Sequence, residues 1–281
     1  MSDDSKRSKS GSDPIAGLSE SLLLIDEHEE EISIDGKPVR AKGIYLLPNL
    51  FTTGALFAGF YAVIAGIDGR FEAAAIAIFV AMIFDGLDGR VARMTNTQSK
   101  FGAEYDSLSD MVSFGVAPAL VVFSWALSDL GKFGWMVAFI YIACAALRLA
   151  RFNTQIDTAD KNFFTGLASP MAGAVIAGMV WVCFDEGWVG VALPAEVAVM
   201  AGCLTLFIGI MMIMNVPYQS FKGLDFKERV PFLVMIAVIL VIALVMLDPP
   251  RVLLTGALLY VMSGPVVAVW RRRRKAPADK A

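Results

Sequence analysis

Apolar residues occur in long blocks from residue 44 onward, separated by short polar connections. A helix needs about 20 predominantly apolar residues to cross a bilayer, and several of the blocks are shorter than that. The pattern predicts an all-α fold: a polytopic membrane protein with about eight transmembrane helices. The approximate limits of the eight blocks are 44–66, 71–86, 105–128, 133–151, 169–184, 195–215, 230–247 and 252–270.

The two ends of the chain differ in composition from the blocks between them. Residues 1–43 are polar and mainly acidic, and we interpret them as a largely disordered cytosolic segment. A regulatory or partner-binding role for the acidic run Glu27–Glu31 is the alternative. Residues 44–270 form the predicted membrane domain. Residues 271–281 form a basic cytosolic tail that anchors on anionic headgroups.

The positions of lysine and arginine indicate how the spans cross the membrane. With the N-terminus inside, the loops on the outer side contain only Arg70, Lys132 and Arg251, whereas every inner segment is basic. Basic residues concentrate on the cytoplasmic side of membrane proteins. We therefore expect eight spans with both termini in the cytosol.

Composition supports this class and limits the chemistry. Apolar residues make up 57% and charged residues 18% of the 281 residues, against roughly 45–50% and about 25% in soluble domains. His28 is the single histidine, and Cys144, Cys183 and Cys203 lie far apart inside apolar blocks. These features argue against Ser–His hydrolysis, histidine-bound zinc and a disulfide framework. One basic run alone does not indicate nucleic-acid binding.

Four aspartates gather where the second block ends and the third begins. Asp85 and Asp88 are three residues apart, Asp106 and Asp110 four apart, so each pair lies on one face of its helix. A short turn between the pairs would bring the two helices side by side. Carboxylates at one site repel one another unless cations compensate, and oxygen ligands favour Mg²⁺ or Mn²⁺. We predict one or two such ions, and a pair could clamp an in-line phosphoryl displacement.

The residues around these aspartates suit a phosphate-bearing ligand. Gly89 and Ala92 leave space on the carboxylate face, and Arg93 offers a forked donor for phosphate. Gly102, one turn before Asp106, allows close helix packing. Solvated helix ends and the ion pathway of a cation transporter or channel are the alternatives. The clustering of carboxylates at one membrane face beside glycine and arginine disfavours both.

The segment Asp85–Asp110 reads Asp-x-x-Asp-Gly-x-x-Ala-Arg-x8-Gly-x3-Asp-x3-Asp. It resembles the signature of the CDP-alcohol phosphatidyltransferase family at every position, and Pro48–Thr52 is similar to the family's first-helix element. The resemblance extends over nearly the whole membrane region. It implies a helical membrane enzyme, commonly a homodimer, that displaces CMP from a CDP-linked lipid with an alcohol.

The resemblance also implies roles for individual residues. The four aspartates would hold two divalent ions, Mg²⁺ or Mn²⁺, and Asp110 would also be the general base. Because an unperturbed aspartate is a weak base for an alcohol, positioning and metal charge must supply most of the rate. The residues that would line the site for the CDP-lipid are Asn49, Thr52, Gly89, Arg93 and Ser99.

The acceptor alcohol remains open within the family among serine, glycerol 3-phosphate, inositol 1-phosphate and choline. Arg148, Arg151 and Asn153 end the fourth block, and Lys222 follows the sixth, all on the predicted cytosolic side. A fixed cation and hydrogen-bonding groups suit the carboxylate and ammonium of L-serine. Anchoring on anionic lipid is the alternative for the basic side chains.

These segments are similar to those of the phosphatidylserine-synthesising branch of the family in bacteria and archaea. The resemblance implies a bacterial inner (cytoplasmic) membrane, with the active site facing the cytosol. The segment Gly166–Pro170 departs from this branch, since such enzymes often have a second proline there. The resemblance thus implies transfer of a phosphatidyl group from CDP-diacylglycerol to L-serine, with the other three acceptors as the alternative.

Overall fold

The computed structural model divides the chain into two compact units, Met1–Ile44 and Tyr45–Ala281. In the first unit it describes one antiparallel strand pair, β1 (Ile32–Ile34) with β2 (Lys37–Val39). The acidic run Glu27–Glu31 and most of the segment expected to be disordered lie outside the described residues. The residues that the structure describes are 32–34, 37–39, 46–95, 99–155, 163–188, 193–219 and 232–275.

The second unit is built mainly from helices. Between α4 and α6 the chain stays helical, through two π-helical segments and a 3-10 turn. A second antiparallel strand pair, β3 with β4, joins the connection after α6 to the one after α8. The bounds in chain order are α2 (Leu46–Ile67), α3 (Phe71–Met94), α4 (Lys100–Asp110), η1 (Met111–Val116), α5 (Ala117–Val122), η2 (Phe123–Leu127), η3 (Ser128–Leu130), α6 (Lys132–Gln155), β3 (Phe163–Thr165), α7 (Ser169–Asp185), α8 (Ala195–Ile213), β4 (Pro217–Gln219), α9 (Phe232–Leu247) and α10 (Pro249–Lys275).

Within the described residues, each of the eight apolar blocks overlaps helical structure, which confirms the all-α class. Among the described residues, five helices are long and apolar enough to cross a membrane. The chain is therefore an integral membrane protein, while the number of eight spans stays a prediction. Helices α7 and α9 are short, at 17 and 16 residues. Helix α10 continues to Lys275, into the expected tail.

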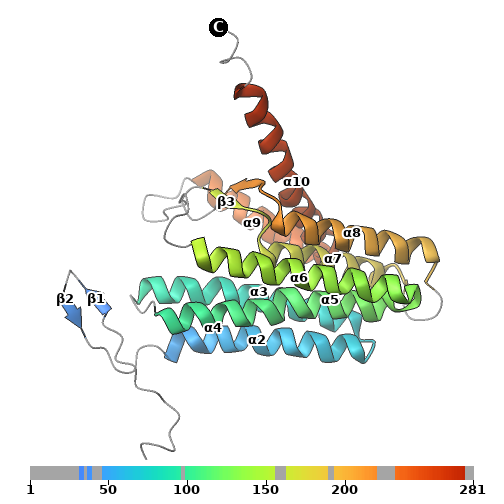
Figure 1. The fold of residues 1–281 in the computed structure, drawn as a ribbon, viewed down its shortest axis with the longest axis horizontal. Coiled ribbons are helices and arrows are strands. Elements are labelled where there is room, and N and C mark those ends of the chain that lie inside the picture. Colours follow the sequence, from blue (N-terminus) through green and yellow to red (C-terminus); the bar gives the residue numbers. More distant parts are fainter. Residues whose placement is uncertain are drawn as a thin grey trace, which may run out of the picture. The chain divides into compact units, whose positions relative to one another are not determined.

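Helices α2 to α8 lie side by side in the second unit (Figure 1). Helix α2 packs along α3, α6 along α8, and α7 against both α3 and α10. Much of the core is alanine, including the fully buried Ala62, Ala65, Ala74 and Ala81. Small side chains let helix backbones approach closely, which is how helices associate when lipid surrounds them.

Large apolar side chains cover the outside of this bundle. Phe57 of α2, Phe139 of α6 and Met200 of α8 are exposed, as are most of the described side chains of α9. Soluble monomers rarely expose apolar patches of this extent. The outer surface is therefore suited to contact with lipid chains.

Gly59 marks a close approach between α2 and η1. A Cβ atom at this position would lie 2.5 Å from the Oγ of Ser113 and 2.7 Å from its Cα. The Ser113 hydroxyl donates a hydrogen bond of 3.0 Å to the carbonyl of Ala55. The glycine thus brings the backbone of α2 against the segment that directly follows α4.

We expect Gly59→Ala to lower the free energy of unfolding by about 2 kcal/mol, because the added methyl group overpacks the contact with Ser113. Thermal unfolding of the purified protein in detergent measures the effect. Gly256→Ala in α10 is the matched control, since a Cβ there meets nothing within 4 Å. Equal melting temperatures for the two variants would contradict the close approach.

Candidate active site

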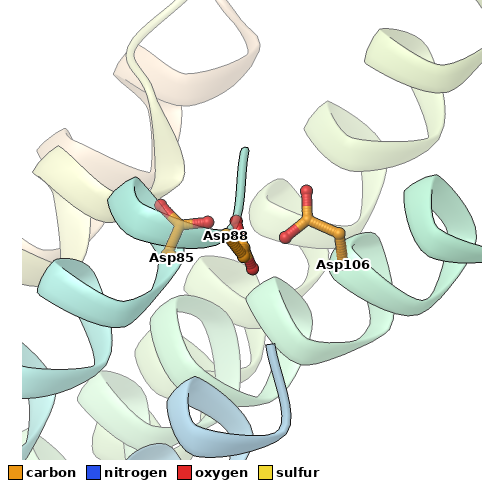
Figure 2. A group of neighbouring side chains, drawn as sticks. All are labelled: Asp85, Asp88 and Asp106. Atoms are coloured by element: carbon orange, nitrogen blue, oxygen red, sulfur yellow. The ribbon is translucent and has the colours of Figure 1, made fainter. Parts of the chain in front are cut away.

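The carboxylates of Asp85, Asp88 and Asp106 converge at one end of the bundle (Figure 2). One oxygen of each lies within 4.8 Å of the corresponding oxygens of the other two. Asp85 and Asp88 come from the last turns of α3, and Asp106 comes from α4. Asp88 is buried, and the other two are half-buried. The cluster therefore depends on two helices that meet at this end.

Asp110 lies one turn beyond Asp106 and belongs to the same site. Its carboxyl group interacts electrostatically with those of Asp85 and Asp106. The helix changes from α to π winding directly after Asp110, and such changes are frequent at functional sites. The structure thus brings together all four aspartates that the sequence singled out.

Helix α2 holds the two carboxylate-bearing helices through hydrogen bonds. The Thr52 hydroxyl donates to Asp88 of α3 at 2.7 Å, and the Ser109 hydroxyl of α4 donates to the Thr52 carbonyl at 3.1 Å. Thr53 and Tyr105 share a further hydroxyl–hydroxyl bond of 2.9 Å between α2 and α4. Thr52 thus contacts α3 through its side chain and α4 through its backbone.

Four other residues predicted to line the CDP-lipid site lie near the same end. The Ser99 hydroxyl caps α4 by accepting a 2.9 Å hydrogen bond from the Gly102 backbone N–H. A Cβ on Gly102 would lie 3.1 Å from Ser99 Oγ and 3.6 Å from Asn49 Oδ1, so these three residues are neighbours. A Cβ on Gly89 would lie 3.5 Å from Nη1 of Arg93. The Arg93 guanidinium therefore lies beside Gly89, where the backbone is open.

Arg148 supplies positive charge next to the aspartates. Its guanidinium interacts electrostatically with Asp110 and Asp85. It also donates a hydrogen bond to the hydroxyl of the buried Ser169, the first residue of α7. The arginine at the end of α6 is thus fixed between the carboxylate cluster and the start of α7.

Arg151 and Asn153, one turn further along α6, contact two different neighbours. Arg151 Nη2 donates to Asn215 Oδ1 at 2.6 Å, just after α8. Asn153 Nδ2 donates to Glu104 Oε2 at 3.3 Å, and Asn153 Oδ1 accepts from the Ser107 hydroxyl at 3.2 Å. Asn153 therefore links α6 to α4 through both ends of its amide. The predicted acceptor residue Lys222 lies outside the described residues.

The sequence analysis missed Asn215 and Glu104. Asn215 is the last residue of the sixth apolar block, and Glu104 directly precedes the third. Asn215 contacts Arg151, which is 64 residues away in the sequence, and Glu104 contacts Asn153, which is 49 residues away. The spacing of residues within one helix cannot reveal contacts between such distant segments.

The donor set at the cluster fits a hard divalent cation. The groups that face one another are carboxylates, with the Thr52 hydroxyl behind Asp88. Asp110 and Asp85 interact electrostatically with the guanidinium of Arg148, and Asp88 interacts with that of Arg93. Carboxyl groups this close share a proton or a cation. Asp85, Asp88 and Asp106 could therefore hold Mg²⁺ or Mn²⁺, which prefer oxygen ligands.

The fold and the site define the class of the protein. It is a helical membrane protein whose carboxylate site lies where its helices meet. The chain belongs to the CDP-alcohol phosphatidyltransferase family, whose model matches residues 45–213. The match covers both pairs of aspartates. It confirms the predicted family and, with it, a transferase.

Similar proteins extend the comparison. The chain is 36% identical over 198 residues to a CDP-diacylglycerol–serine O-phosphatidyltransferase of Helicobacter pylori, covering 70% of this chain and 82% of that one. It is 33% identical over 180 residues to an archaetidylserine synthase of Methanothermobacter thermautotrophicus, covering 63% and 71%. The crystal structure of a Mycobacterium tuberculosis phosphatidylinositol phosphate synthase with CDP-DAG bound matches with a TM-score of 0.46 and 18% identity, covering 61% of this chain and 83% of that chain.

We expect Thr52→Val to raise the Mn²⁺ concentration for half-maximal activity by about tenfold, because Asp88 loses the hydrogen bond that orients it. Activity measured over a Mn²⁺ titration tests this. Thr53→Val is the control, since it removes a hydroxyl that bonds Tyr105 and not a carboxylate. A Mn²⁺ requirement that is the same in both variants would show that Thr52 does not act through Asp88.

Proposed function

We propose that the protein transfers the phosphatidyl group of CDP-diacylglycerol to the hydroxyl of L-serine, giving phosphatidylserine and CMP. The main observation that supports this reaction is the convergence of carboxylates from α3 and α4 within the family-matched region. The choice of serine is supported by two relatives, one bacterial and one archaeal. Their names specify different lipids and the same alcohol.

The CDP-lipid is held by residues around the carboxylate cluster. Arg93 presents a forked donor to the pyrophosphate, beside the open backbone at Gly89. Asn49 and Ser99, adjacent at the start of α4, suit hydrogen bonds to the cytidine part. Thr52 completes this set by fixing Asp88. In this arrangement the scissile phosphate lies over the aspartates.

The reaction is a direct displacement at phosphorus. The serine hydroxyl oxygen bonds to the phosphorus that carries the diacylglycerol, and the bond from that phosphorus to the CMP oxygen breaks. CMP leaves with the bonding electron pair, and Asp110 accepts the hydroxyl proton as general base. Arg148, beside Asp110 and Asp85, stabilises the negative charge of this region.

Asp85, Asp88, Asp106 and Asp110 are the residues that would hold two divalent ions, Mg²⁺ or Mn²⁺. When bound, such ions neutralise the pyrophosphate and stabilise CMP as the leaving group. The chain itself contributes the fixed positions of the four carboxylates, which come from two helices joined through α2. Direct attack is favoured over a phosphatidyl-enzyme because the site offers no activated nucleophile among its described residues besides the aspartates.

The acceptor binds near the end of α6. Arg148 and Arg151 lie three residues apart on one helical face and supply cationic donors for the serine carboxylate. Asn153 and Lys222 are further candidates for hydrogen bonds to it. The same arginines would suit the phosphate of glycerol 3-phosphate or inositol 1-phosphate, which are the alternative acceptors, together with choline.

The site faces the cytosol in the proposed topology, with both termini on the same side of a bacterial cytoplasmic membrane. The basic residues near the ends of α3, α6 and α10 support this orientation. CDP-diacylglycerol enters from the surrounding lipid and serine from the aqueous side. The proposed assembly is a homodimer.

The experiment that tests the proposed function is CMP release by the purified protein in detergent. The assay contains CDP-diacylglycerol and Mg²⁺ or Mn²⁺, with serine, glycerol 3-phosphate, inositol 1-phosphate or choline added singly. We expect release that depends on serine and stops with a chelator. Release driven by another acceptor would overturn serine and leave the displacement chemistry in place.

We expect Asp110→Asn to reduce turnover by at least about 100-fold, because the amide cannot accept the hydroxyl proton. Binding of CDP-diacylglycerol, measured by direct titration, should be retained. Glu104→Gln is the matched control, since Glu104 is a carboxylate of the same helix that bonds Asn153. Turnover in Asp110→Asn equal to that of the control would remove Asp110 as the base.

We expect Arg151→Ala to raise the KM for serine by roughly tenfold or more, the effect of losing hydrogen bonds to a charged ligand, with little change in the KM for CDP-diacylglycerol. Steady-state kinetics with each substrate varied in turn measures both constants. Arg70→Ala, which removes an exposed arginine before the first turn of α3, is the control. Equal changes in both KM values would make Arg151 a structural or lipid-anchoring residue.

A further inference from the structure

We propose that Asn215 is a positioning residue that orients Arg151 toward the acceptor and thereby contributes to acceptor selection. This inference rests on the proposed function, in which Arg151 binds the serine carboxylate. It concerns a residue beyond the family-matched region, which ends at residue 213.

The contact between the two side chains orients the arginine without neutralising it. Arg151 Nη2 donates to Asn215 Oδ1 at 2.6 Å, and Nη1 lies 3.4 Å from the Ile213 carbonyl oxygen. A guanidinium has five N–H donors in a planar fork, so others remain for a ligand. Because the asparagine amide is neutral, the arginine keeps its full positive charge for an anionic group. An aspartate at the same position would bond it equally well and cancel that charge.

The backbone at Asn215 is fixed in a tight turn. The Val216 N–H donates to the Met214 carbonyl at 2.8 Å, which closes the turn around Asn215. The Gly166 N–H in turn donates to the Val216 carbonyl at 2.9 Å. Gly166 has a φ of +90°, and a Cβ there would lie 2.3 Å from the Met212 carbonyl oxygen, so glycine is required. The side chain of Asn215 therefore projects from a backbone held on both sides.

The strand that follows this turn is anchored to α10. Tyr218 of β4 is buried, and its hydroxyl donates to the Val261 carbonyl at 3.0 Å. Its ring stacks on that of Tyr260 with 5.5 Å between centroids. A Cβ on Gly264 would lie 2.4 Å from Tyr218 Cζ, so this glycine makes room for the ring. Helix α10 thus supports the segment that places Asn215.

This support reaches the second arginine as well. Tyr260, which stacks on Tyr218, also interacts electrostatically with Arg148. Both acceptor arginines lie on α6 inside the matched region, whereas Asn215 and Tyr260, which interact with them, lie outside it.

A double-mutant cycle tests the proposal. We expect Asn215→Ala to raise the KM for serine by about tenfold, the effect of one hydrogen bond to a charged group. The KM for CDP-diacylglycerol should change by less than about twofold. In the Arg151→Ala background, Asn215→Ala should cause no further rise in the serine KM, because Asn215 acts through Arg151 alone.

The variant Asn215→Asp distinguishes an effect on Arg151 from an effect on the stability of the protein. It keeps the hydrogen-bond acceptor, so we expect a melting temperature equal to that of the unmodified protein. It adds a negative charge beside Arg151, so the KM for serine should rise at least as much as in Asn215→Ala. Met214→Ala, the exposed neighbour, is the control and should leave both constants unchanged.

The outcomes distinguish this inference from the proposed function. A raised serine KM in Arg151→Ala with a normal one in Asn215→Ala would overturn the role of Asn215 alone. Additive effects in the double variant would do the same, since Asn215 would then act independently of Arg151. A normal serine KM in Arg151→Ala would overturn the acceptor site itself, and the role of Asn215 with it.

Discussion

The hydrogen bonds that α2 makes to α3 and α4 are the contacts on which the site depends. Asp88 is held by the Thr52 hydroxyl, and the Thr52 carbonyl is held by Ser109, one residue before Asp110. Gly59 lets the next turns of α2 approach η1 closely. Carboxylates on separate helices repel one another, so their convergence requires a rigid element between them. Small side chains and hydroxyl groups on α2 supply that element within an apolar bundle.

The charges at this end of the bundle divide into two functional groups. Aspartates from α3 and α4 form the centre, where a cation and the pyrophosphate would bind. Arginines from α6 lie beside it, Arg148 against the aspartates and Arg151 toward the segment after α8. An anionic acceptor held by these arginines would lie next to the base and the scissile phosphate. The geometry thus joins the proposed acceptor site to the reaction centre through one helix.

The sequence predicted the parts of this arrangement that depend on spacing within a helix. Asp85, Asp88, Asp106 and Asp110 were identified from their i,i+3 and i,i+4 separations, and the apolar blocks located the helices. Contacts between distant segments were not predictable in this way. The Thr52–Asp88 bond spans 36 residues and the Arg151–Asn215 bond 64. The place of Thr52 in the CDP-lipid site stays a prediction, and its hydrogen bond to Asp88 was not foreseen.

The central claim is that carboxylates from two helices bind the same divalent cation. Anomalous diffraction from crystals grown with Mn²⁺ tests it most directly. We expect an anomalous peak whose ligands include Asp85 and Asp88 of α3 and Asp106 of α4. A peak bound by one helix alone, or none at the cluster at saturating Mn²⁺, would contradict the claim.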